Sequence, residues 1–115
     1  DRAHHTVQFL TLDGKHIETQ AGYGLPANVD TWKNLLLVPE LHARITILDE
    51  NNKPVARLGA DVDRIKSVNG IRNDSSKWID GKFVHPHDAC FGADGSIFVA
   101  EWVQTGRVSK LKRLG

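Results

Sequence analysis

Residues 83–102 read FVHPHDACFGADGSIFVAEW, and this stretch decides the fold. The apolar segments DACFG and IFVA are short strand candidates, and the Asp-Gly pair between them is typical of a turn. We therefore expect a β-hairpin, with the polar cluster HPHD at its head. That cluster has two interpretations: it is a metal or catalytic site, or it is only the opening of a strand.

Three stretches of the chain align with one another. They are DRAHHTVQFLTLDGK (1–15), PELHARITILDENNK (39–53) and AEWVQTGRVSKLKRL (100–114). Each contains an acid, Asp1, Glu40 or Glu101, followed by an alternating strand candidate. In the first two copies a turn signal and a second short strand candidate come next. A hairpin therefore recurs along the chain.

A second alignment lies upstream of the last two copies. LPANVDTWKNLLLVPE (25–40) matches HPHDACFGADGSIFVAE (85–101), with Pro26 over Pro86 and Asn28 over Asp88. Two more strands thus precede each hairpin, and the repeating unit has four short strands. Asp1 and Glu40 are separated by the length of one repeating unit. This length is close to the roughly 40 residues of a β-propeller blade.

This register predicts an all-β fold made of four-stranded antiparallel blades. Residues 1–24 supply the outer hairpin of one blade, 25–59 a complete blade, and 83–115 a last blade that lacks its outer strand. Residues 60–82 form an insertion between blades, with one helical turn expected near 62–68; it is a decorated loop or a binding loop. About two to three blades are present, whereas a propeller closes with about four to eight. We therefore expect an incomplete ring, completed by further blades or by self-association.

Composition excludes some classes of function. The formal net charge is +1, so the basic surplus of a nucleic-acid-binding protein is missing and no nucleic-acid partner is expected. No apolar run approaches the roughly 20 residues that cross a bilayer, so we expect no membrane segment. The single cysteine, Cys90, allows no internal disulfide, and the absence of Met predicts a processed or excised piece.

The repeat pattern resembles NHL repeats, the blades of six-bladed propellers. The shared features are a proline-led inner strand, an Asp-Gly turn, the apolar strand IFVA, an acid, and then GRV with a lysine-bearing strand. The ending KRLG is similar to a carboxy-terminal blade, whose outermost strand the start of the full chain supplies. The resemblance implies the fold strongly and the function weakly, because propellers host scaffolds, ligand binders, hydrolases and lyases.

A narrower resemblance concerns His85, Pro86, His87 and Asp88. The opening HPHDACFGADGSIFVAE is similar to one in the peptidyl-hydroxyglycine amidating lyases, which bind a central zinc through histidines that follow such prolines. It implies that His87 is a zinc ligand on the channel side of the first strand. The preceding blade has Ala27 at this place, so only one ligand of three carries over. The cofactor stays unknown, with zinc or calcium as the candidates.

Each candidate also has a structural interpretation. His87 then lines the channel without a metal, and Asp88 bonds neighbouring backbone amides, as Asn28 can in its own blade. His85 is held extended by the proline that follows it and is a candidate ligand contact at the channel mouth. Trp78 in the insertion either caps the channel as a ligand-binding residue or packs the loop down.

Other chemistry-bearing residues are expected to be structural. Recurrence of the acids in every blade predicts bonds to loop amides or to Arg44 and Arg107 rather than a catalytic pair. Cys90 is expected to be a buried, inert thiol. Four histidines fall in loops or outer strands and are excluded as ligands: His4, His5, His16 and His42.

Two classes of function remain. The first is an NHL-type binding or scaffold module that presents channel and loop surfaces to a protein, a peptide or a small ligand. The second is part of a metal-dependent propeller lyase or hydrolase, with acid–base groups on other blades. Ala27 favours the first, so whether the protein is an enzyme stays open. The resemblance to the lyases implies an extracytoplasmic or secreted location.

Overall fold

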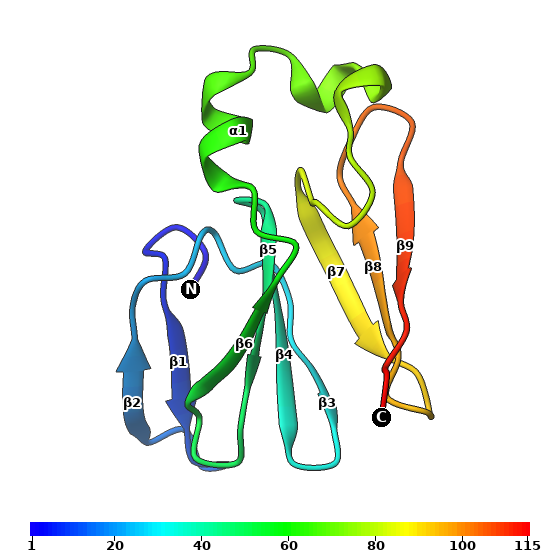
Figure 1. Cartoon of the computed structure of the whole chain (residues 1–115). Helices are drawn as coiled ribbons and strands as arrows, with labels where there is room; N and C mark the ends of the chain where they lie inside the picture. The colour runs from blue at the N-terminus through cyan, green and yellow to red at the C-terminus, as the bar shows by residue number, and fades with distance from the viewer.

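The computed structural model describes residues 1–115, and it is built almost entirely of β-strands (Figure 1). Nine strands form three antiparallel sheets of two, four and three strands, each in simple chain order. The all-β prediction is confirmed. The strands are β1 (Val7–Leu10), β2 (His16–Gln20), β3 (Asp30–Trp32), β4 (Leu35–Glu40), β5 (Arg44–Leu48), β6 (Pro54–Leu58), β7 (Pro86–Phe91), β8 (Ile97–Glu101) and β9 (Arg107–Leu111).

Local sequence accounts for the tight turns between strands. At the β5–β6 turn the Asp49 side chain accepts hydrogen bonds from the backbone N–H groups of Asn51 and Lys53, each at 2.9 Å. Asn52 in the same turn has a φ of 61°, a left-handed conformation that asparagine tolerates well. The run of aspartate and asparagine at this point therefore fixes the hairpin that the sequence predicts.

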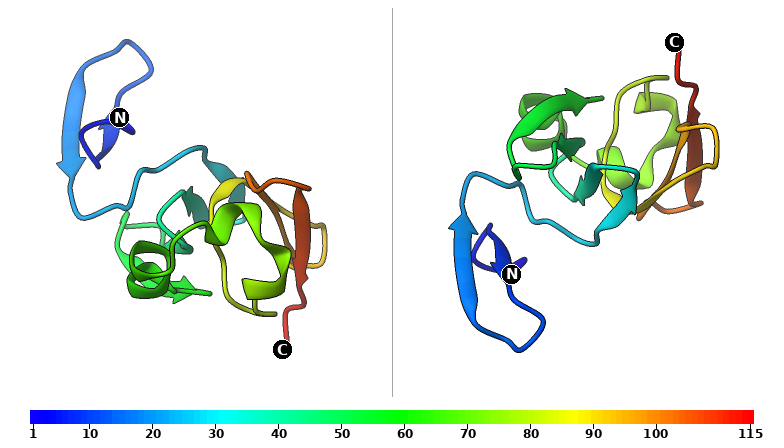
Figure 2. Two further views of the ribbon diagram at one scale, coloured as in Figure 1. Left: turned by 90° about the horizontal axis from the view of Figure 1, so that it is seen from above. Right: turned by 90° about the horizontal axis from the view of Figure 1, so that it is seen from below.

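The three sheets stack side by side, with the four-stranded sheet in the middle (Figures 1 and 2). Strand β4 packs against both neighbouring sheets because its side chains alternate between the two faces of the middle sheet. Val38 packs with Val7 of β1 on one face. Leu37 packs on the other face with Ala89 of β7 and Val99 of β8. The middle sheet is therefore buried on both faces.

The outer face of the last sheet is open. Its pairing register copies that of the middle sheet, since Ala100 faces Val108 as Pro39 faces Ile45. The counterpart of Ile45, which is 0% exposed, is Val108, which is 72% exposed. Likewise Leu37 is fully buried whereas its counterpart Phe98 is 37% exposed. In the middle sheet, these apolar positions are covered by the next sheet. In the last sheet, the equivalent positions face outward.

The insertion is ordered and packs on the upper end of the last sheet (Figure 1). It contains α1 (Val62–Ser67), which confirms the predicted helical turn, and two 3-10 turns, η1 (Ile71–Asn73) and η2 (Ser75–Lys77). Ile71 is buried with Val84 and Val103, so the segment has a small core of its own. None of the helices in this structure could span a lipid bilayer.

Candidate functional site

A buried glutamate ends the second strand of the middle sheet. Glu40 is 0% exposed, and its carboxylate accepts hydrogen bonds from the Gly24 amide at 2.5 Å and from Thr46 Oγ1 at 2.5 Å. Arg44 Nε donates to both oxygens, at 2.9 and 3.0 Å, and Arg44 Nη2 reaches the Gly22 carbonyl at 2.5 Å. The carboxylate is therefore fully occupied by structural partners, which a buried charge requires.

Glu101 has the same environment in the last sheet. It accepts a hydrogen bond from the Val84 amide at 2.6 Å and is bridged by Arg107 Nε, while Arg107 Nη2 donates to the Lys82 carbonyl at 2.6 Å. We call this set, a buried Glu with a loop amide and an Arg, the glutamate bridge. The prediction that these acids bond loop amides and arginines is confirmed for Glu40 and Glu101. Asp1 differs, because its exposed carboxylate accepts only from His4.

His85 joins the last sheet to the loop after β4. Its Nδ1 lies 2.7 Å from the Leu41 carbonyl oxygen, and because a carbonyl only accepts, Nδ1 carries the proton. The His85 carbonyl accepts from the Trp102 amide at 2.8 Å, as the Leu25 carbonyl accepts from the Leu41 amide at 3.0 Å in the previous repeat. His85 thus occupies a structural position, with its ring half-buried between two sheets.

His87 stands at a β-bulge. The register passes from Pro86 opposite Glu101 to Asp88 opposite Ala100, so His87 has no partner across the ladder. Its side chain is exposed, and its ring lies edge-on to Trp102 at 6.3 Å between centroids. No three His, Cys, Asp or Glu side chains of the chain gather as a metal site. The residues of this chain therefore do not by themselves fit the zinc that the resemblance implies, or calcium.

Asp88 bonds a side chain of the neighbouring sheet rather than a backbone amide. Asn28 Nδ2 donates to Asp88 Oδ1 at 2.6 Å, so the two repeat counterparts bond each other directly. A second link lies further along, where the Phe91 amide donates to Asp30 Oδ2 at 2.8 Å. The inner segments of the two sheets are thus held together by polar side chains from both.

The structure places Trp78 within the packing of the insertion. Its Nε1 donates to the Ile71 carbonyl at 2.6 Å, and its half-buried ring packs on the small core of that segment. The guanidinium of Arg107 lies 5.5 Å from the ring centroid. Of the two interpretations given above, this geometry corresponds to Trp78 packing the loop down.

The expectation for Cys90 is wrong. The thiol is exposed on the outer face of β7, beside Phe98, Ala100 and Val108, where a hollow of about 120 Å³ lies. The bulge at His87 is the cause, because one extra residue shifts the alternation of the strand. Ala89 then points inward and Cys90 outward.

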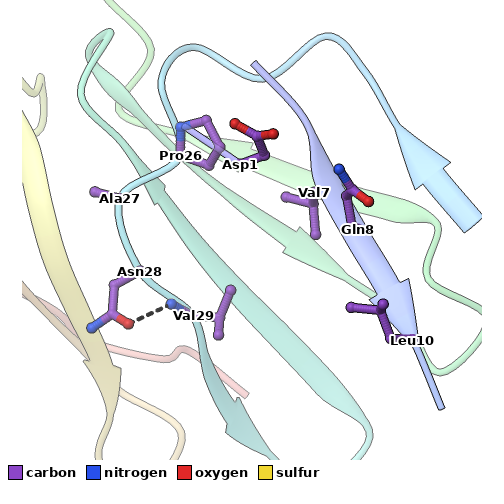
Figure 3. Close-up of a pocket in the computed structure, with 8 residues that line it drawn as sticks. All are labelled: Asp1, Val7, Gln8, Leu10, Pro26, Ala27, Asn28 and Val29. Atoms are coloured by element: carbon purple, nitrogen blue, oxygen red, sulfur yellow. Dashed lines mark hydrogen bonds between the residues drawn. The ribbon is translucent and has the colours of Figure 1, made fainter. Parts of the chain in front are cut away.

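A groove of about 420 Å³ runs between the first hairpin and the middle sheet. Figure 3 shows its two sides: Val7, Gln8 and Leu10 of β1 on one, and residues 26–29 on the other. In the middle sheet β5, the counterpart of β1, pairs with β4, whereas β1 pairs only with β2. The groove therefore lies along an unpaired strand edge with apolar walls.

Histidine side chains gather near the loop after β4. The rings of His5 and His42 lie 5.8 Å apart, and His5 Nδ1 bonds the Tyr23 carbonyl at 3.0 Å. Burial, together with the positive charges of Lys66 and of nearby histidines, holds the pKa of His42 below its usual value. No sequence pattern indicates this group, because its members come from loops far apart in the chain.

Comparisons with known proteins add no assignment: no protein-family model matches the chain, and no curated protein is significantly similar to it.

Proposed function

We propose that this chain is a segment of an NHL-type β-propeller that serves as a binding or scaffold module. The observation that carries the proposal is a difference in exposure between equivalent positions of two sheets. Leu37 and Ile45 are fully buried in the middle sheet, whereas Phe98 and Val108, their counterparts in the last sheet, are exposed. A stack of sheets in which each face is built to receive the next is the architecture of propeller blades. The open face is therefore the seat of a further blade.

The opposite end of the segment supports the same interpretation. Strand β1 has an unpaired edge, and the groove beside it lies where the counterpart of β4 would pair. Two strands added there would complete a four-stranded blade and cover Leu10 and Val29, which are 54% and 52% exposed. Further blades, from the same polypeptide or from other copies of the chain, would fill both ends.

The repeated glutamate bridge supports the assignment to NHL-type blades. It ties the amide two residues before the proline of the first strand to the acid that ends the second, in both repeats. This explains physically why the acid and the arginine recur together, since each buried carboxylate needs a cation and a loop amide as partners. The two acids therefore have a structural role. The surfaces that remain for a protein, peptide or small-molecule ligand are the channel side and the loops.

The alternative function is part of a metal-dependent propeller lyase or hydrolase. One observation favours it: His87 follows the proline of a first strand, is exposed, and makes no hydrogen bond with the protein. Its imidazole is thus available as one of three ligands, with the other two on further blades. Zinc that is bound by the assembled protein and lost in His87→Ala would favour this function; zinc binding that His87→Ala leaves unchanged would remove His87 from any metal site.

The experiment for the main proposal is native mass spectrometry, together with urea denaturation as the measure of stability, of the protein and of a Phe98→Asp, Val108→Asp variant. We expect either assemblies at multiples of 12.8 kDa that the variant dissociates, or one longer polypeptide that the variant destabilises. Val55→Asp is the matched control, because Val55 is 57% exposed on outer strand β6 and should change neither result. A monomer of 12.8 kDa whose stability the double substitution leaves unchanged would contradict the proposal.

A further inference from the structure

A second hollow, of about 290 Å³, lies between the insertion and the last sheet. It is lined by residues 65–72 and by His85. Two permanent cations, Lys66 and Arg72, are among the lining residues, and no carboxylate is. The residues that line the hollow therefore carry a net positive charge, which favours binding of an anion.

Arg72 is fixed in place but lacks acceptors. Its guanidinium stacks on the ring of Trp102, with Cζ 3.6 Å from the ring centroid, and its carbonyl accepts from the Gln104 amide at 3.1 Å. Its Nε is buried and makes no hydrogen bond. Its Nη1 and Nη2 groups also make no hydrogen bond with the protein but are not buried, so a ligand oxygen can reach them.

Lys66 is also without an acidic partner. The other cation of α1, Arg64, is paired with Asp61, whereas Lys66 forms no ion pair. The two buried acids are already paired, Glu40 with Arg44 and Glu101 with Arg107. The two cations of the hollow are therefore not neutralised by the protein.

We infer that this hollow binds a phosphate group, carried by a small ligand, between Arg72 and Lys66. The planar fork of Arg72 suits two oxygens of an oxyanion, and Lys66 supplies a second positive charge, which together match a dianion. The inference goes beyond the proposed function, because it uses only contacts within this chain and needs no further blade. The sources of such a group are inorganic phosphate and an organic phosphomonoester.

The test is an NMR titration of ¹⁵N-labelled protein with inorganic phosphate at constant ionic strength and pH. We expect a saturable shift of the Arg72 Nε–H signal, because this group belongs to the same guanidinium as the Nη groups that would bind the anion. Lys66→Gln should weaken binding about tenfold, the effect of losing one charge-assisted contact. Lys53→Gln is the matched control, because Lys53 lies in the β5–β6 turn at the other end of the sheets and loses the same charge (Figure 1).

Arg72→Lys tests the fork apart from the charge, and we expect it to weaken binding more than Lys53→Gln does. Lys66 is exposed, so Lys66→Gln keeps the test valid even if substitution of Arg72 disturbs the insertion. The same titration with glycerol 2-phosphate distinguishes the two sources of the phosphate group. Binding tighter than that of inorganic phosphate identifies a phosphomonoester, and equal or weaker binding identifies free phosphate. No saturation up to about 10 mM of either probe, or an equal effect of Lys66→Gln and Lys53→Gln, would overturn the inference. Either failure leaves the native mass spectrum, and so the proposed function, untouched.

Discussion

Glu40 and Glu101 hold equivalent places in successive sheets, and each carboxylate is buried between a loop amide and an arginine. The amide belongs to the residue two before a proline in both cases, Gly24 and Val84. The link therefore ties the entry of each sheet to its second strand. A repeated charged contact at this depth is a stability element, and its removal should be costly.

We predict that Glu40→Ala lowers the free energy of unfolding by about 3–5 kcal/mol, because it leaves the Arg44 guanidinium and the Gly24 amide without their acceptor. Urea denaturation followed by circular dichroism measures the change. Glu18→Ala, on the exposed strand β2, is the control and should cost less than about 1 kcal/mol. Equal effects of the two substitutions would show that the glutamate bridge does not hold the sheet.

His42 makes stability depend on pH. Its folded pKa lies below its usual value, chiefly through burial and then through the charges of Lys66, His5 and His85. The unfolded state therefore binds the proton more readily, so stability is fully present above the unfolded pKa of about 6.5 and decreases as pH falls through that value. We expect the urea midpoint to fall between pH 7.5 and pH 5.5, and to fall less in His42→Gln. The same pH slope in both proteins would rule out His42 as its source.

The base of the insertion depends on Gly59, where the chain leaves β6, and on Phe83, whose amide donates to the Gly59 carbonyl at 3.0 Å. Gly59 has a φ of 64°, and a Cβ added there would lie 2.4 Å from the ring of Phe83, a side chain that is 1% exposed. Gly59→Ala should therefore destabilise the fold by more than the left-handed backbone cost of about 1–2 kcal/mol. Gly14→Ala isolates that backbone cost, since Gly14 has a φ of 87° and open space around it. Thermal unfolding of the two variants compares them, and an equal loss would mean that the contact with Phe83 yields without cost.

Much of the fold could be predicted from the sequence because its signals are local. The turn residues at 49–52 and the alternation in β4, β5 and β8 lie within a few positions of the elements that they specify. The recurrence of Glu40 and Glu101 at one repeat position was also enough to predict a structural role. Each of these inferences needs only chain order and the period of a strand.

The parts that sequence reasoning missed depend on packing between distant segments. The bulge at His87 reverses the facing of Cys90, and no residue near it signals the bulge. The bond from His85 to the Leu41 carbonyl joins two loops 44 positions apart. The hollow with Arg72 exists only once the insertion folds back onto Trp102. Periodicity carries no information on such contacts.

We propose that a further blade covers the outer face of the last sheet, and Cys90 lies on that face. It is the only cysteine of these 115 residues, it is exposed, and it lies beside Phe98 and Val108. The measurement is the rate of maleimide modification of Cys90 in protein from its natural source, across a dilution series, compared with the rate in urea. A covered face predicts native modification about tenfold or more slower than in urea, with protection lost in Phe98→Asp, Val108→Asp. Modification as fast as in urea at every concentration would show that nothing covers this face, and would contradict the account.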